Sequence, residues 1–207
     1  MAQNSAFNAI HSLEVEQKYR LEDAAAFKDQ LTALGACWES PIQQTDLYFN
    51  HPAKDFKQTD EALRIRTVGE QNWVTYKGPK LDHETKTRRE IEVPLASGKT
   101  AQGQFAEVLQ LLGFRPVWEV RKTRLPGTLI WQGVTVTLAL DSLAADKSAA
   151  NSKNTLGDFL ELELVVPPEE LALAKGHLAD LATHLNLSQP ERRSYLELLL
   201  EQSPQAG

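Results

Sequence analysis

The sequence predicts an α+β fold in which an antiparallel β-sheet has helices packed against one face. Eight short segments alternate apolar and polar residues as half-buried strands do, and Gly and Pro residues separate many of them. Four other segments carry apolar residues at helical spacing. No linker divides the chain, so we expect residues 13–203 to form a single domain after a flexible tail over 1–12.

The elements follow one another along the whole chain. The expected strands are 13–20, 44–49, 62–68, 73–77, 86–95, 117–125, 134–141 and 159–166. The expected helices are 22–34, 100–112, 171–185 and one that begins near Pro190. Gly35 and Gly113 end the first two helices, and Ser188 with Glu191 fits a capping box for the last. Residues 144–155 are small and polar, which predicts an exposed loop, either a surface insertion or a lid over a site.

Composition narrows the class of protein without identifying it. The formal net charge is -6, and an acidic balance argues against a nucleic-acid or membrane-surface partner, because both need a basic field. No segment approaches the roughly 20 apolar residues of a membrane span. Cys37 is the single cysteine, so no intrachain disulfide can form, and a cytoplasmic location is expected.

Charged residues gather on one face of the expected strands. Because side chains alternate along a strand, Glu14, Glu16 and Lys18 share a face, as do Arg64 and Arg66. The acids on these faces are Glu14, Glu16, Glu90, Glu92, Asp141, Glu161 and Glu163. The bases are Lys18, Arg64, Arg66, Lys77, Arg88, Lys122 and Arg124.

Two arrangements of these faces are open. They can form the solvated side of a sheet packed on helices, or they can converge inside a barrel, whose interior holds one small ligand at eight strands. Burying so many charges requires partners. A polyanion with bound metal supplies them, because Arg and Lys neutralise phosphate and carboxylates hold Mg²⁺ or Mn²⁺. The pairing of acids on some strands and bases on others favours the barrel.

Other chemistries find no support in the sequence. It has no phosphate loop, no G-x-G-x-x-G and no G-x-S-x-G nucleophile elbow. A zinc site is not expected, because there is one cysteine and the five histidines show no ligand spacing. Cys37 lies beside Trp38 at a strand start, where a packing role is expected.

A set of short motifs in order resembles the CYTH superfamily, also called triphosphate tunnel metalloenzymes. LEVEQKY over 13–19 has the E-x-E-x-K pattern that opens this family. It is followed by LRIR at 63–66, YKGP at 76–79, RREIE at 88–92, RKTR at 121–124, Asp141, LGDFLELE at 156–163 and RSYLEL at 193–198. The resemblance covers residues 13–200, and it is the order of the whole set that makes it specific.

The resemblance implies a closed eight-stranded antiparallel β-barrel, or tunnel, with helices packed on its outside. It implies that the metal ligands are Glu14, Glu16, Asp141, Glu161 and Glu163. We expect the substrate phosphates to be bound by Lys18, Arg64, Arg66, Lys77, Arg88, Lys122, Arg124 and Arg193. Arg193 stands where many relatives have Lys, so its reach differs. The expected catalytic groups are Glu14, Glu16, Lys18 and Lys77.

The resemblance also implies a reaction on a triphosphate. The motifs at 156–159 and 193–195 favour the class IV adenylate cyclase branch, which converts ATP to cyclic AMP and pyrophosphate. The alternatives are hydrolysis of inorganic triphosphate, thiamine triphosphate or a nucleoside triphosphate, and a sensor that binds without catalysis. The number of acids argues against a pure sensor, because an anion binder needs few carboxylates. A homodimer is one assembly that the sequence allows.

Overall fold

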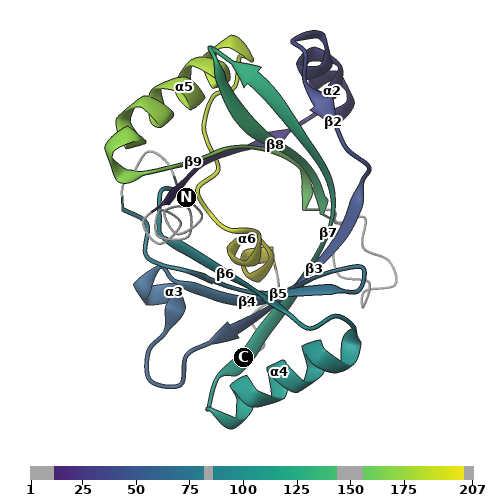
Figure 1. The fold of residues 1–207 in the computed structure, drawn as a ribbon, viewed down its shortest axis with the longest axis vertical. Helices are drawn as coiled ribbons and strands as arrows, with labels where there is room; N and C mark the ends of the chain where they lie inside the picture. The colour runs from purple at the N-terminus through teal and green to yellow at the C-terminus, as the bar shows by residue number, and fades with distance from the viewer. Residues whose placement is uncertain (1–11, 82–85, 144–155, 203–207) are drawn as a thin grey trace, which may run out of the picture.

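The computed structural model describes residues 12–81, 86–143 and 156–202 (Figure 1). Its strands are β1 (Leu13–Leu21), β2 (Cys37–Trp38), β3 (Ile42–Asn50), β4 (Ala62–Val68), β5 (Gln71–Lys77), β6 (Glu90–Leu95), β7 (Arg115–Trp131), β8 (Val134–Leu143) and β9 (Gly157–Val166). Its helices are α2 (Ala24–Ala33), α3 (Phe56–Thr59), α4 (Lys99–Leu111), α5 (Leu171–His184) and α6 (Tyr195–Gln202), with a 3-10 turn η1 (Pro168–Glu170).

The strands form one antiparallel sheet in the order β1-β9-β8-β7-β3-β4-β5-β6, and the short β2 pairs with β7. The sheet is strongly curled, so its strands follow a ring in Figure 1. β7 is the longest strand at 17 residues and joins the two halves of the ring, pairing with β8 along one part and with β3 along another. The expected α+β class with an eight-stranded antiparallel sheet is confirmed.

The closed barrel is borne out only in part. Within the described residues no ladder joins the end strands β1 and β6. Residues 86–88, just before β6, cross to β1 instead: Glu14 N donates to Arg88 O at 3.3 Å, Arg88 N to Glu14 O at 3.2 Å, and Lys86 N to Glu16 O at 3.0 Å. The sheet is therefore open along most of its two end strands and linked at this point.

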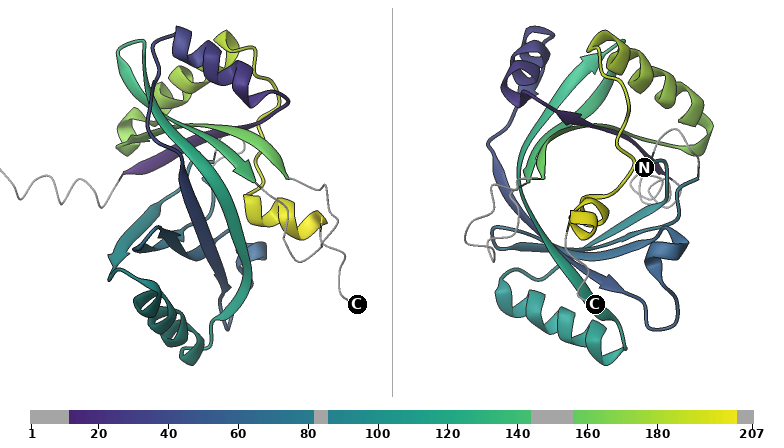
Figure 2. Two further views of the ribbon diagram at one scale, coloured as in Figure 1. Left: turned by 90° about the vertical axis from the view of Figure 1, so that its right-hand side faces the viewer. Right: turned by 180° about the vertical axis from the view of Figure 1, so that it is seen from behind.

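Helices on the convex side bury the apolar faces of the strands in two groups (Figures 1 and 2). α2 and α5 cover β1, β8 and β9, where Leu138, Leu162 and Leu178 are fully buried. α3 and α4 cover β4 and its neighbours, where Ile65 is fully buried against α4. Strand periodicity predicted these faces, because every second residue of the strands faces the helices.

α6 packs elsewhere, which corrects the expectation that all helices lie outside. Its Tyr195 and Leu198 pack with Tyr48, Val120 and Phe159, residues that share a face with the charged positions of their strands. The helix therefore lies at one end of the ring, as the side view in Figure 2 shows. These inward residues are apolar, so burying them stabilises a helix at this end.

The start of the last helix differs from the expected one. Ser188 and Glu191 do not cap it; α6 begins at Tyr195, and Ser194 with Glu197 forms the capping box. Ser194 N donates to Glu197 Oε2 at 2.6 Å, and Glu197 N donates to Ser194 Oγ at 3.1 Å. Glu191 N instead donates to the backbone oxygen of Lys18 at 2.6 Å, which ties the segment before the helix to β1.

Smaller differences remain. The sequence did not indicate the short helix α3, and the strand expected over 86–95 begins its ladder with β5 only at Glu90. The loop expected over 144–155 lies outside the described residues. No helix in the described parts of the chain is long and apolar enough to cross a membrane.

Truncating the core should destabilise the fold strongly. Leu138 on β8 is fully buried between Gly127 of β7 and Leu162 of β9. We expect Leu138→Ala to lower the free energy of unfolding by about 2–5 kcal/mol, because the surrounding sheet cannot collapse into the cavity left behind. Urea denaturation measures this loss, and an unchanged midpoint would contradict the placement of Leu138.

Candidate functional site

A cavity of about 820 Å³ lies on the concave side of the curled sheet, and charged side chains line it. Its lining includes these residues expected from the sequence: Glu14, Glu16, Lys18, Arg64, Arg66, Lys77, Arg88, Lys122, Arg124, Glu161 and Glu163. They come from strands β1, β4, β5, β7 and β9 and from the segment before β6, yet they face one space. Of the two arrangements open from the sequence, this one matches converging faces.

Register explains why the charges meet. On β1 and β9, Glu16 stands opposite Glu163 and Lys18 opposite Glu161. On β7 and β8, Arg124 stands opposite Asp141. Directly paired residues of neighbouring strands point to the same side of a sheet, so one row of charges extends from strand to strand.

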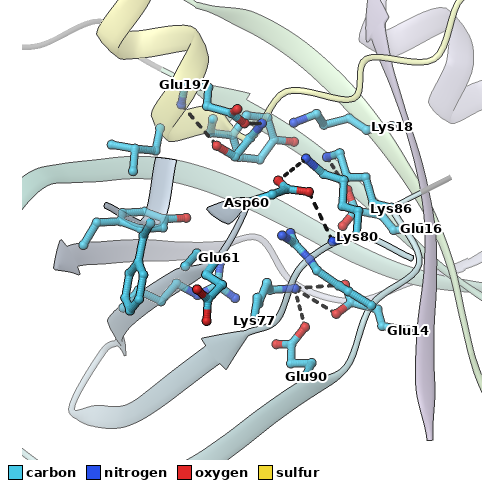
Figure 3. A pocket seen from close by; sticks show the side chains of 18 of the residues that line it. Glu14, Glu16, Lys18, Asp60, Glu61, Lys77, Lys80, Lys86, Glu90 and Glu197 are labelled. Atoms are coloured by element: carbon cyan, nitrogen blue, oxygen red, sulfur yellow. Dashed lines mark hydrogen bonds and ion pairs between the residues drawn. The ribbon is translucent and has the colours of Figure 1, made fainter. Parts of the chain in front are cut away.

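Two lysines of the cavity, Lys77 and Lys86, are paired with carboxylates, as Figure 3 shows. Lys77 Nζ donates to Glu14 Oε2 at 2.8 Å and also contacts Glu90. Lys86 Nζ donates to Glu16 Oε1 at 2.8 Å. Although burial opposes it, the cations around Glu16, Lys86 first, bring the pKa of that carboxyl to about 2. Glu16 is therefore ionised in the structure.

Lys18 occupies a special position among these bases. It is 1% exposed, and its Nζ lies 3.9 Å from the centre of the Tyr195 ring and donates to the backbone oxygen of Arg193 at 2.6 Å. Burial, together with the neighbouring charge of Lys86, brings its pKa well below the usual range. The lowered pKa makes this amine easier to deprotonate, and a bound polyanion would raise the pKa by favouring the charged form.

Asp141 connects two cations with the first residue of α6. It accepts from Lys122 Nζ at 2.7 Å, from Arg124 Nε at 2.7 Å and from Tyr195 Oη at 2.9 Å. Its side chain is fully buried and is not part of the cavity lining. Arg124 also pairs with Glu161. Burial, followed by the charge of Arg124, lowers the pKa of Lys122 to about 8.

The acids Glu14, Glu16 and Glu163 form the part of the site that best suits a divalent cation. Burial and the charges of Glu14 and Glu16 raise the pKa of Glu163 to about 7, so negative charge here is incompletely compensated. Within the described residues no three acidic or imidazole groups already stand as a ligand cluster. The donors are carboxylate oxygens, which Mg²⁺ and Mn²⁺ prefer, so the residue types fit these ions once the lysines bound to Glu14 and Glu16 give way.

The structure brings the backbone oxygen of Arg193 to Lys18 but does not bring its guanidinium to the other predicted residues. Its guanidinium is about half exposed, pairs with Glu191 at 2.5 Å and Glu201 at 2.7 Å, and does not line the cavity. Its expected phosphate contact remains a prediction that this arrangement does not favour. The neighbouring Arg192 lines the cavity instead.

Several residues of the site were missed from the sequence. Lys86 shares strand parity with Arg88, and Asp46 shares it with Gln44 and Tyr48, so the same alternation could have identified both. Lys80 also lines the cavity, and its Nζ donates to Asp60 Oδ1 at 2.7 Å (Figure 3). Tyr195 had no such signal, because its approach to Asp141 depends on how α6 packs.

The bond from Tyr195 to Asp141 should contribute to stability. We expect Tyr195→Phe to lower the free energy of unfolding by about 1 kcal/mol, because the ring keeps its packing and one buried hydrogen bond is lost. Thermal unfolding of the two proteins at the same pH measures this difference. A variant as stable as the parent would show that the hydroxyl adds nothing to the anchoring of α6.

Known proteins are similar to this chain in sequence and in fold. The CYTH domain family matches residues 12–195. The chain is 34% identical over 189 residues to MJ0240 of Methanocaldococcus jannaschii, which carries a provisional adenylate cyclase name; the match covers 90% of this chain and 98% of that one. It is 34% identical over 197 residues to adenylate cyclase CyaB of Aeromonas hydrophila, covering 92% and 90%.

A solved structure is similar to this chain over nearly its whole length. The PH1819 protein of Pyrococcus horikoshii OT3 superposes with a TM-score of 0.75 at 36% identity, covering 92% of this chain and 99% of that one. The family match extends over the curled sheet and ends at Tyr195, the first residue of α6. This protein belongs to the CYTH family.

Proposed function

We propose that the protein is a divalent-metal-dependent enzyme that acts on a triphosphate substrate in the charged cavity. The observation that carries this proposal is the convergence of basic side chains from separate strands on one cavity of about 820 Å³. Among the described residues, the buried Nε atoms of Arg64 and Arg88 have no hydrogen-bond acceptor. A phosphate chain would supply acceptors to such donors, and Arg binds phosphate oxygens bidentately.

The carboxylates give the proposal its metal. Glu14, Glu16, Glu161 and Glu163 would hold Mg²⁺ or Mn²⁺, while Asp141, sealed by its cations, would act on the ions only indirectly. The bound ion would neutralise charge on the phosphate oxygens as a phosphorus–oxygen bond breaks. Arg64, Arg66, Lys122 and Arg124 would bind and orient the phosphates, so the residues of this chain contribute positioning and fixed charge.

Among triphosphate reactions we favour the cyclase. Relatives that are 34% identical over about nine-tenths of this chain carry adenylate cyclase names. The cavity lining also includes apolar residues, among them Val117, Leu196 and Leu200. A phosphate chain alone has no apolar surface that could pack against them. A nucleoside would bury apolar surface there. In this reaction the ribose 3′-hydroxyl attacks the α-phosphorus of ATP and pyrophosphate leaves.

Hydrolysis of a triphosphate is the second candidate. The charged residues of the cavity would contact the phosphate chain in the same way in a cyclase and in a hydrolase, so they do not distinguish the two reactions. The lining also includes Lys57 and Lys80, two further bases that could contact a phosphate chain. We further propose that substrate binding occurs in a closed tunnel, with residues 86–88 completing the wall between β1 and β6.

Product analysis separates the candidates. The purified protein is incubated with ATP or with inorganic triphosphate, each with Mg²⁺ or Mn²⁺. We expect cyclic AMP and pyrophosphate from ATP. Orthophosphate from inorganic triphosphate would favour the hydrolase, and binding of both without turnover would leave a sensor. Failure to bind or convert either compound in the presence of metal would overturn the proposal.

A further inference from the structure

Two arginines of the cavity wall are held from behind by a carboxylate. Asp46 lies on β3, next to Arg66 of β4 in the sheet, and is 2% exposed. Arg66 donates to it through Nε at 2.8 Å and Nη2 at 2.9 Å, and Arg64 donates through Nη1 at 3.3 Å. Both arginines line the cavity, whereas Asp46 does not. Asp46 therefore contacts two residues that line the cavity without lining it itself.

The geometry of this group leaves donors free for a ligand. An arginine has five N–H donors, and Arg66 spends two of them side-on against Asp46, so three remain. The two-point contact also fixes the plane of the guanidinium, which a single contact would not do. Although burial opposes ionisation, Arg64 and Arg66 bring the pKa of Asp46 well below its usual range, so the group stays charged.

We propose that Asp46 is a positioning residue that aligns Arg64 and Arg66 for the phosphate chain. This inference rests on the proposed function and adds a residue to it. Fixing an arginine before the ligand arrives reduces the conformational entropy that binding would otherwise cost. Asp46 keeps the two guanidinium groups in place, and their remaining donors stay available to a phosphate chain in the cavity that both arginines line.

A second pair in the same wall has the same design. Asp141 on β8 accepts from Lys122 and Arg124, which lie two residues apart on the neighbouring strand β7. Asp46 accepts from Arg64 and Arg66, which lie two residues apart on β4. In both cases a buried carboxylate outside the cavity lining holds two cavity-lining cations of one strand. The same arrangement therefore occurs twice: a buried carboxylate orients two cationic side chains that line the cavity.

The sign of one measurement distinguishes positioning from a plain effect of charge. Replacing Asp46 by Asn removes one negative charge beside the cations at nearly constant shape. If only the field mattered, a more positive cavity would bind a polyanion more tightly. If Asp46 positions the arginines, binding becomes weaker, because the guanidinium groups lose the contact that orients them.

The test compares Asp46→Asn with the parent protein, measuring calorimetric affinity for inorganic tripolyphosphate and kcat and KM for the triphosphate that the parent converts. We expect affinity to fall and KM to rise about 10-fold, with kcat changed by less than about threefold. In an Arg66→Ala background the same change should add less than about twofold, because the two-point contact is gone and only the 3.3 Å contact between Asp46 and Arg64 is left to lose. Glu119→Gln is the matched control. Glu119 lies on β7 opposite Leu47 of β3, accepts a hydrogen bond from Arg121 and does not line the cavity, so the substitution removes a carboxylate outside the site.

Each result decides something. Unchanged or tighter binding by Asp46→Asn overturns the positioning role while leaving the proposed function intact. Absence of tripolyphosphate binding by the parent overturns the proposed function, and the positioning role with it. If Asp46→Asn does not fold, Arg66→Lys decides, because it keeps the charge but cannot make the two-point contact. We expect Arg66→Lys to bind about 10-fold more weakly, and parent-like affinity would overturn the inference.

Discussion

Glu163→Gln is expected to reduce metal-dependent turnover by about 100-fold or more while the chain stays folded. Glu163 stands opposite Glu16 across β1 and β9 and lies in the field of Glu14, so it belongs to the group of acids proposed to hold the metal. The substitution keeps the shape of the side chain and removes a charged oxygen ligand. Initial rates over a series of Mg²⁺ or Mn²⁺ concentrations measure the effect.

The same variant should be more stable than the parent above neutral pH when no divalent ion is present. The folded-state pKa of Glu163, about 7, is raised above the ordinary value of 4.5, so its contribution to stability is fully present below pH 4.5 and lost as the pH rises through 7. Gln cannot ionise and keeps that contribution. We expect a gain on the order of 1–3 kcal/mol at pH 8 that disappears toward pH 4.5.

Thermal unfolding at pH 8 and pH 4.5, with and without Mg²⁺, measures this behaviour. Metal should stabilise the parent at pH 8 more than it stabilises Glu163→Gln. Glu107→Gln, at an exposed position on α4, is the control for loss of a carboxylate far from the site. Full metal-dependent activity in Glu163→Gln would remove this residue from the metal site, and equal effects of metal on both proteins would do the same.

Arg66→Ala is expected to raise KM for the triphosphate about 10- to 100-fold, because hydrogen bonds to charged phosphate oxygens are lost. It should also lower the free energy of unfolding by about 3 kcal/mol, since Asp46 is 2% exposed and keeps only its 3.3 Å contact with Arg64 as an arginine partner. Steady-state kinetics and urea denaturation measure the two effects.

Asp46, the partner of Arg66, allows the predicted loss of stability to be checked. Combining Arg66→Ala with Asp46→Asn removes the buried unpaired carboxylate and should recover part of the stability, but not the low KM. Arg121→Ala, which removes an exposed arginine from β7, should leave KM within about twofold of the parent. An unchanged KM in Arg66→Ala would exclude Arg66 from phosphate binding.

Most of the strand faces could be predicted from the sequence, because a period of two assigns each residue to one side whatever the neighbours are. That is why Glu14, Glu16 and Lys18, or Arg64 and Arg66, could be placed together before any fold was known. The longer helices over the convex face, α2, α4 and α5, followed in the same way from their spacing, whereas the short α3 did not. The last helix was placed too early, because two capping boxes are present in the sequence and packing of Tyr195 selects the second.

The sequence by itself determined which residues carry charge toward a shared face, and, through the order of its motifs, the family. Only the tertiary structure decided which of these charges are partners. Strand order and register are long-range properties, and they place Asp46 behind Arg64 and Arg66, Lys86 against Glu16, and Asp141 out of the cavity. Local alternation cannot report such pairings, because it depends on neighbours along the chain, whereas a buried charge is stabilised by neighbours in space.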